Sequence, residues 1–213
     1  MAEVEEHAVL RVALRRLKAG DIEGLADLVR SYQVEAARVA YLITRDRTLT
    51  DDVTQEAFLR VYRHIQNYDE SRPFAPYLMR IVANTAVEAV KRRERENHRH
   101  AEVDPADMLT PPLGHPEAEV ESAELRQTIW EALDSLSPEQ RAVVVLRYYA
   151  DYSEREVAAA LNIPSGTVSW RLHNARRQLR AALNHLGRQS SPAPAGKAAP
   201  SRPSKQPKQE GSI

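Results

Sequence analysis

Cysteine is absent from the 213 residues of the chain. Without a thiol, the chain forms no disulfide, binds no zinc through thiolates and offers no cysteine nucleophile. Its seven glycines form neither of the standard glycine-rich loops that bind nucleotide phosphates. No apolar run approaches the ~18 residues that a membrane span needs, and no N-terminal stretch resembles a signal peptide. These absences predict a cytoplasmic protein with no cofactor, no metal site and no small-molecule substrate.

The chain also has no formal net charge, because its thirty basic residues balance thirty acidic ones. Taken alone, this balance argues against a nucleic-acid-binding protein, because such proteins usually have a basic domain. The charges are segregated, however: −1 over residues 1–66, +2 over 67–100, −9 over 101–140 and +8 over 141–213. An acidic middle and a basic C-terminal part favour a polyanionic partner for only part of the chain.

Apolar residues recur at helical spacing through most of the chain, which predicts an all-α fold. A second helix is expected from about 22 to 45, after a short first one. Thr50 is expected to cap the third helix, with two aspartates in its first turn. Pro73 and Pro76 bracket the start of a long helix that ends in the basic run 91–100, because proline is tolerated only in the first turn.

A linker interrupts the helical pattern. Residues 101–120 contain four prolines, one glycine and a concentration of acidic residues, and their apolar residues show no helical spacing. This composition predicts a flexible acidic linker. It separates two small helical domains, over 1–100 and 121–187. A disordered tail is expected over 188–213, since this segment has no aromatic residue and cannot bury enough apolar surface to fold.

The second domain contains a predicted helix-turn-helix. Capping-box patterns at Ser137 and Ser153 begin two helices, and the second of these covers 154–161. A longer helix is expected after a short turn, with Ser165 as its cap. Its apolar stripe consists of Val168, Leu172, Ala175, Leu179 and Leu183. The opposite face carries cationic and bidentate donors, which a helix needs to contact base edges and phosphates in the major groove.

These residues carry a family resemblance. Region 4 of bacterial sigma factors resembles the segment LDSLSPEQRAVVVLRYYADYSEREVAAALNIPSGTVSWRLHNARRQLR. Region 2 resembles DDVTQEAFLRVYRHI followed by FAPYLMRIVANTAVEAVKRRER. The two-region layout, over residues 10–187, is similar to the extracytoplasmic function (ECF) group. The resemblance implies a sigma factor that binds core RNA polymerase and directs promoter-specific transcription initiation.

The resemblance also implies partners and their sites. The partners are the beta prime clamp helices and beta flap of core RNA polymerase, promoter DNA, and an anti-sigma factor. The polymerase-binding positions are Asp51, Asp52, Gln55, Glu56, Phe58 and Arg60. Positions for the unpaired minus-ten element, including aromatics for stacking and cations for the backbone, are Tyr68, Asp69, Arg72, Tyr77, Arg80, Asn84, Glu88, Lys91 and Arg92. Positions for the minus-thirty-five element are Arg147, Thr167, Ser169, Trp170, Arg171, His173, Asn174, Arg176 and Arg177.

Several alternatives stay open at this level. Tyr77 is either a core residue or a base-stacking one, and Trp170 either contacts a thymine methyl group or packs on the neighbouring helix. A helix-turn-helix regulator that binds duplex DNA without polymerase is the alternative function, and a helical adaptor that binds only protein is another. An enzyme is disfavoured because the sequence has no HExxH, GxSxG or nucleotide-binding loop. The charge distribution predicts weak DNA binding by the chain alone and tight binding only when polymerase holds its parts apart.

Overall fold

The computed structural model describes residues 2–99 and 129–189, which are called the first unit and the second unit below. Side chains are described for 9–97 and 129–183. Every regular element within these ranges is helical, which confirms the predicted all-α fold. In the same ranges, no helix combines the length and the apolar character that crossing a membrane requires.

Some sequence-based expectations fall outside these ranges. The expected linker over 101–120 and the start of the second domain up to 128 lie outside the described residues, as does the chain from 190 onward. The last helix continues to Gln189, although the sequence predicts that the tail begins at 188.

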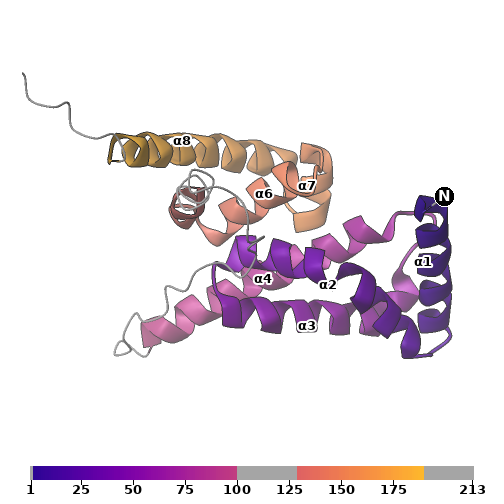
Figure 1. Ribbon diagram of the computed structural model, residues 1–213. Helices are drawn as coiled ribbons and strands as arrows, with labels where there is room; N and C mark the ends of the chain where they lie inside the picture. Colours follow the sequence, from indigo (N-terminus) through magenta and orange to yellow (C-terminus); the bar gives the residue numbers. More distant parts are fainter. Residues whose placement is uncertain (1, 100–128, 190–213) are drawn as a thin grey trace, which may run out of the picture.

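The first unit is a bundle of helices joined by short turns. In chain order its elements are α1 (Ala2–Lys18), α2 (Glu23–Thr44), α3 (Arg47–His64), the 3₁₀ turn Ile65–Asn67 and α4 (Phe74–Arg99). Figure 1 shows α2, α3 and α4 side by side, with α1 standing across one end of the three. The core consists of fully buried side chains from all four helices, among them Leu17, Leu28, Val39, Val61 and Leu78.

The start of α3 differs from the sequence-based prediction. Asp46, and not Thr50, caps this helix: its Oδ1 accepts a hydrogen bond of 2.8 Å from the backbone N–H of Leu49. Thr50 lies one turn into the helix, where its buried hydroxyl donates to the carbonyl of Asp46 at 2.6 Å. Because the helix begins earlier than predicted, Asp51 and Asp52 leave the first turn and stay exposed on its surface.

The second unit contains the predicted helix-turn-helix. A helical segment over 129–134 precedes α6 (Pro138–Tyr148), α7 (Glu154–Leu161) and α8 (Ser165–Gln189). Both predicted capping boxes, at Ser137 and Ser153, are confirmed. Ser165 is the first residue of α8 and does not precede it as a cap.

The predicted apolar stripe of α8 is confirmed over most of its length. Val168, Leu172 and Ala175 are fully buried, and Leu179 packs against the core. Leu183 is 39% exposed, so the stripe leaves the core at its C-terminal end.

The two units pack against each other. Helix α6 lies on α2 and α4, and α7 lies on α4 (Figure 1). The buried side chains of both units form one continuous apolar cluster. This packing decides which of the predicted binding surfaces are exposed.

A close approach of α1 to α2 yields a stability prediction. A Cβ at Gly24 would lie 2.4 Å from the carbonyl oxygen of Ala13 and 2.6 Å from the amide nitrogen of Leu17, whereas a Cβ at Gly166 would meet nothing within 4 Å. Gly24→Ala is therefore expected to lower the free energy of unfolding by about 1–3 kcal/mol. The control, Gly166→Ala in α8, is expected to raise it by about 0.5–1 kcal/mol. Urea denaturation measures both, and equal effects would contradict the described helix contact.

Candidate nucleic-acid and partner interfaces

An apolar groove runs between α2 and α3. Exposed Val34 and Leu59 lie along it, together with the edge of Phe58. Phe58 itself is only 5% exposed, so it contributes a wall of the groove. Asp51 and Gln55 add an acidic and an amide group to the rim. The groove thus joins predicted polymerase-binding positions into one surface suited to an amphipathic partner helix.

Two residues predicted for different partners form an ion pair. Arg60, predicted for polymerase, places a guanidinium nitrogen 2.8 Å from the carboxylate of Glu88, predicted for minus-ten DNA. Arg60 Nε also donates to Glu56 at 3.0 Å. The hydrogen bond to Glu88 raises the pKa of Arg60 above its ordinary value, with a smaller contribution from Glu56. Arg60 therefore ties α3 to α4, and Glu88 presents a partly neutralised carboxylate.

Tyr68 is a packing residue in this structure, in contrast to the base-contacting role that the sequence predicts. It is 5% exposed, and its ring centroid lies 4.8 Å from that of Tyr77 and 5.7 Å from that of Phe74. Its hydroxyl donates a hydrogen bond of 2.5 Å to the carbonyl of Arg72. Burial raises the pKa of the Tyr68 phenol. Its ring thus packs against Phe74 and Tyr77, and its hydroxyl binds the loop between the 3₁₀ turn and α4.

The loop itself is held by local polar contacts. The Asp69 carboxylate accepts hydrogen bonds from the hydroxyl of Ser71 at 2.7 Å and from its backbone N–H at 3.0 Å. These two bonds lower the pKa of Asp69. Lys18, at the end of α1, pairs with Glu70 at 2.9 Å. Arg72 stays exposed beside Asp69, so the loop presents one ordered cation to solvent.

The predicted minus-ten residues of α4 separate into two groups. Arg80 and Arg92 are exposed, and Tyr77 is half-buried against the core, which favours the core reading of Tyr77. Asn84 and Lys91 instead contact the second unit. Asn84 Nδ2 donates a hydrogen bond of 2.8 Å to the carbonyl of Ala160 in α7, and Lys91 forms an ion pair with Glu139 in α6.

The predicted DNA-reading face of α8 is turned to solvent. Trp170 is 64% exposed, so it does not pack on the neighbouring helix, and its indole is accessible to a base. The hydroxyl of Ser169 donates to the carboxylate of Glu154. The remaining positions on this helix are exposed or half-buried: Thr167, Arg171, His173, Asn174, Arg176 and Arg177.

Arg147, at the end of α6, differs from these residues. Its guanidinium donates to the carbonyl of Tyr152 at 3.1 Å and lies 5.7 Å from the ring centroid of Tyr148. These contacts place Arg147 across the turn between α6 and α7, where its charge is half-exposed.

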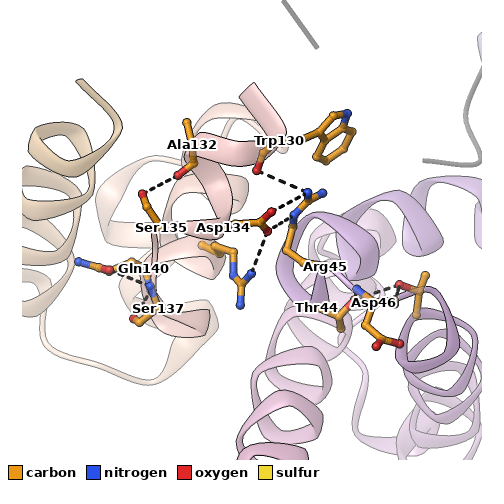
Figure 2. A network of polar contacts seen from close by, with 11 residues as sticks. Thr44, Arg45, Asp46, Trp130, Ala132, Asp134, Ser135, Ser137 and Gln140 are labelled. Atoms are coloured by element: carbon orange, nitrogen blue, oxygen red, sulfur yellow. Dashed lines mark hydrogen bonds and ion pairs between the residues drawn. The ribbon is translucent and has the colours of Figure 1, made fainter. Parts of the chain in front are cut away.

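Sequence reasoning missed a cluster at the junction of the two units. The guanidinium carbon of Arg45 lies 4.4 Å from the ring centroid of Trp130 and 5.4 Å from that of Tyr41. Arg45 Nε is 2.7 Å from a carboxylate oxygen of Asp134 (Figure 2). Arg141 approaches the same carboxylate at 3.9 Å. Arg45 and Asp134 are 89 positions apart, so no local pattern points to this contact.

No cluster suited to a metal ion occurs among the side chains that the structure describes. The described surface does include an apolar groove between α2 and α3 and exposed cations on α4 and α8. Such surfaces bind proteins and nucleic acids.

Comparisons with known proteins identify the family. A family model described as Sigma-70 region 2 matches residues 28–96, and one described as Sigma-70, region 4 matches residues 126–179. SigW of Bacillus subtilis, an ECF RNA polymerase sigma factor, is 32% identical over 184 residues, which cover 84% of this chain and 98% of SigW. The RNA polymerase sigma-E factor of Streptomyces coelicolor is 32% identical over 164 residues, which cover 77% and 88% of the two chains.

Solved structures share the fold. RpoE, in a co-crystal structure with the anti-sigma factor NepR from Bartonella quintana, has a TM-score of 0.61 at 18% identity, with 75% of this chain and 96% of RpoE covered. CnrH, in complex with the cytosolic domain of CnrY, has a TM-score of 0.55 at 24% identity, with 83% and 98% covered.

The buried hydroxyl of Tyr68 yields a second prediction. Tyr68→Phe keeps the ring and removes the hydrogen bond to the Arg72 carbonyl, so the free energy of unfolding is expected to fall by about 0.5–1.5 kcal/mol. Tyr62→Phe is the control, because Tyr62 is 42% exposed on α3 and is expected to tolerate the change. Urea denaturation of the two variants distinguishes the roles: an unchanged stability in Tyr68→Phe would mean that the phenol is not bound to the loop.

Proposed function

Because the chain belongs to the ECF RNA polymerase sigma factors, we propose that it binds core RNA polymerase and directs promoter-specific transcription initiation. The observation that carries this proposal is the presence, in order on one chain, of a region 2 unit with an apolar groove and a region 4 unit with an exposed cationic helix face. A regulator that binds duplex DNA independently of polymerase would not require the region 2 unit. The curated relatives named as sigma factors also favour the sigma factor over that alternative.

Core polymerase is proposed to bind at the groove between α2 and α3. The apolar floor of the groove supplies contact area, and the carboxylates on α3 set the charge of its rim. The proposed contacts are Asp51, Asp52, Gln55 and Glu56, with Phe58 as a wall and Arg60 as the residue that orients Glu56. A helix with apolar and basic side chains, such as a clamp helix of the beta prime subunit, complements this surface.

Helix α8 is proposed to read the minus-thirty-five element in the major groove. Exposed Trp170, His173 and the half-buried Asn174 face the side on which base edges would lie, and Trp170 is suited to an apolar contact with a thymine methyl group. Arg171, Arg176 and Arg177 are proposed to bind phosphates, since guanidinium groups pair with phosphate oxygens in a bidentate manner.

The minus-ten element is proposed to bind along α4 and the loop before it. Arg72, Arg80 and Arg92 are exposed and offer a cationic path for a single-stranded backbone. Asn84 and Lys91 complete this path only when the second unit moves away, because both contact that unit here. An anti-sigma protein is a further proposed partner, by analogy with the complexes of RpoE with NepR and of CnrH with CnrY.

Run-off transcription with purified core RNA polymerase and genomic fragments tests the proposed function. The chain is expected to direct specific transcripts that polymerase alone does not make. Val34→Glu, which places a charge in the groove, is expected to lower polymerase affinity and transcription by tenfold or more, about the effect of 1.4 kcal/mol.

Val12→Glu is the matched control for the groove. Val12 on α1 is 55% exposed and Val34 is 54% exposed, so the two changes perturb folding to a similar degree. Val12→Glu is expected to leave polymerase binding unchanged. Duplex binding without any transcript would favour the regulator, and equal losses in both variants would show that the groove is not the docking site.

The cationic face of α8 yields a prediction on salt dependence. The double variant Arg171→Ala with Arg176→Ala is expected to weaken promoter binding and to reduce the slope of log K against log [salt] by about 2, roughly one unit per phosphate contact. Arg11→Ala with Arg38→Ala removes the same charge from exposed positions on α1 and α2. A slope that changes equally in both double variants would show that α8 does not bind phosphates.

A further inference from the structure

An acidic side chain lies at the proposed DNA-reading face of α8. Helix α8 itself carries no aspartate or glutamate along Ser165–Gln189, which suits a helix that faces a polyanion. The carboxylate comes instead from α7, which packs on α8 (Figure 1). Glu154 Oε2 accepts a hydrogen bond of 2.5 Å from the hydroxyl of Ser169, one of the positions predicted for the minus-thirty-five element. This contact places a negative charge directly beside that position.

The cap of α7 does not use this carboxylate. Ser153 and Glu156 close the N-terminus of α7 with a complete capping box. Glu154, the first residue of the helix, takes no part in the box. Among the side chains that the structure describes, no lysine or arginine forms an ion pair with Glu154. Its charge is therefore neither used by the cap nor neutralised by a neighbouring cation.

Ser169 lies in the part of α8 that is suited to reach base edges. In a helix-turn-helix, the N-terminal residues of the second helix contact base edges in the major groove. Ser169 is near the start of α8, it is exposed, and the next residue, Trp170, is 64% exposed. Glu154 is half-buried beside it. A base opposite Ser169 would therefore meet the serine oxygen and the carboxylate together.

The hydrogen bond between the two side chains fixes what they offer to a base. A serine hydroxyl has one proton, and an ionised carboxylate has none. Because the proton of Ser169 is donated to Glu154, the serine oxygen and the carboxylate present lone pairs to the solvent. The two side chains thus form an acceptor pair, which needs a hydrogen-bond donor on the base edge.

The four base edges differ in how well they match the acceptor pair. In the major groove, guanine shows two acceptors, and thymine shows an acceptor and a methyl group. Adenine shows an amino group beside the N7 acceptor, whereas cytosine shows its N4 amino group with no acceptor beside it. A carboxylate that is desolvated against guanine or thymine gains no donor, which is costly. Cytosine is thus the edge that satisfies the acceptor pair without opposing lone pairs.

We propose that Glu154 and Ser169 select a base with a major-groove amino group, cytosine before adenine, at one position of the minus-thirty-five element. The inference rests on the proposed function, since it assigns base specificity to the face of α8 that is proposed to read this element. Glu154 lies on the first helix of the helix-turn-helix and has the same sign of charge as the phosphates, so no sequence pattern associates it with DNA.

Selection from a promoter library tests the acceptor pair. The full chain, assembled with core RNA polymerase, is bound to duplexes whose minus-thirty-five element is randomised, and the bound duplexes are sequenced. The wild-type chain is expected to enrich cytosine over guanine and thymine roughly tenfold at one position. Glu154→Gln keeps the size of the side chain and adds an amide donor. It is expected to reduce this enrichment to about twofold or less and to favour adenine, since glutamine pairs with adenine N6 and N7.

Asp151→Asn is the matched control. Asp151 is a fully exposed carboxylate in the turn before α7, and its φ of +55° suits asparagine, so the change removes the same charge and keeps the fold. It is expected to leave every base preference unchanged. Glu154→Ala, which has no acceptor, is expected to lose the cytosine preference without gaining one for adenine. Urea denaturation of each variant checks that the second unit remains folded.

Three results would overturn the acceptor pair. The first is a wild-type chain with no position that prefers cytosine. The second is a set of base preferences that is the same in the wild-type chain, Glu154→Gln and Glu154→Ala. The third is tighter binding of all sequences by Glu154→Gln with unchanged preferences, because the carboxylate would then act by repelling phosphates.

Run-off transcription separates the acceptor pair from the proposed function. A chain that directs specific transcripts but keeps its cytosine preference in Glu154→Gln would reject only the acceptor pair. The same library is also bound to the chain without polymerase. A chain that directs no transcript, and whose cytosine preference on this library is lost in Glu154→Gln, would reject the sigma-factor function and keep the acceptor pair.

Discussion

The apolar packing of α6 on α2 and α4 holds the two halves of the chain together, and the guanidinium of Arg45 lies at this junction beside the rings of Tyr41 and Trp130 and paired with Asp134. The buried side chains of both units form one continuous cluster there. Three proposed binding surfaces differ in exposure as a result. The groove between α2 and α3 and the outer face of α8 are exposed, whereas Asn84 and Lys91 on α4 contact the second unit. Access to each surface is therefore decided by contacts between the units.

The segregated charges of the chain form ion pairs at the same junction. The acidic stretch 101–140 contributes Asp134 and Glu139, and these carboxylates pair with Arg45 and Lys91 of the first unit. Part of the basic surface that would bind nucleic acid is thus neutralised within the molecule. The net charge of zero is therefore compatible with the two proposed DNA-binding surfaces, because the acidic residues of 101–140 offset the basic residues elsewhere in the chain.

Local patterns were sufficient to predict the helices, both capping boxes and the buried stripe of α8, because these features depend on residues within one or two turns. The start of α3 was predicted wrongly because both Asp46 and Thr50 are residue types that cap helices, and α3 begins directly after Asp46, the residue that follows the left-handed end of α2. The burial of Tyr68 and the pairing of Arg45 with Asp134 depend on residues from separate helices. No spacing rule reaches such contacts, since they are set by packing across the bundle.

The proposed promoter binding requires the second unit to move away from α4, because Asn84 and Lys91 contact that unit in the structure. Because the chain has no cysteine, labels at Ser31→Cys on α2 and Arg180→Cys on α8 occupy two defined, exposed positions. Pulsed electron–electron double resonance between two spin labels at these sites measures the distance between the units. The account predicts one short distance for the free chain and a population several tens of ångströms longer in the complex with core polymerase and promoter DNA. The same short distance in both states would contradict it.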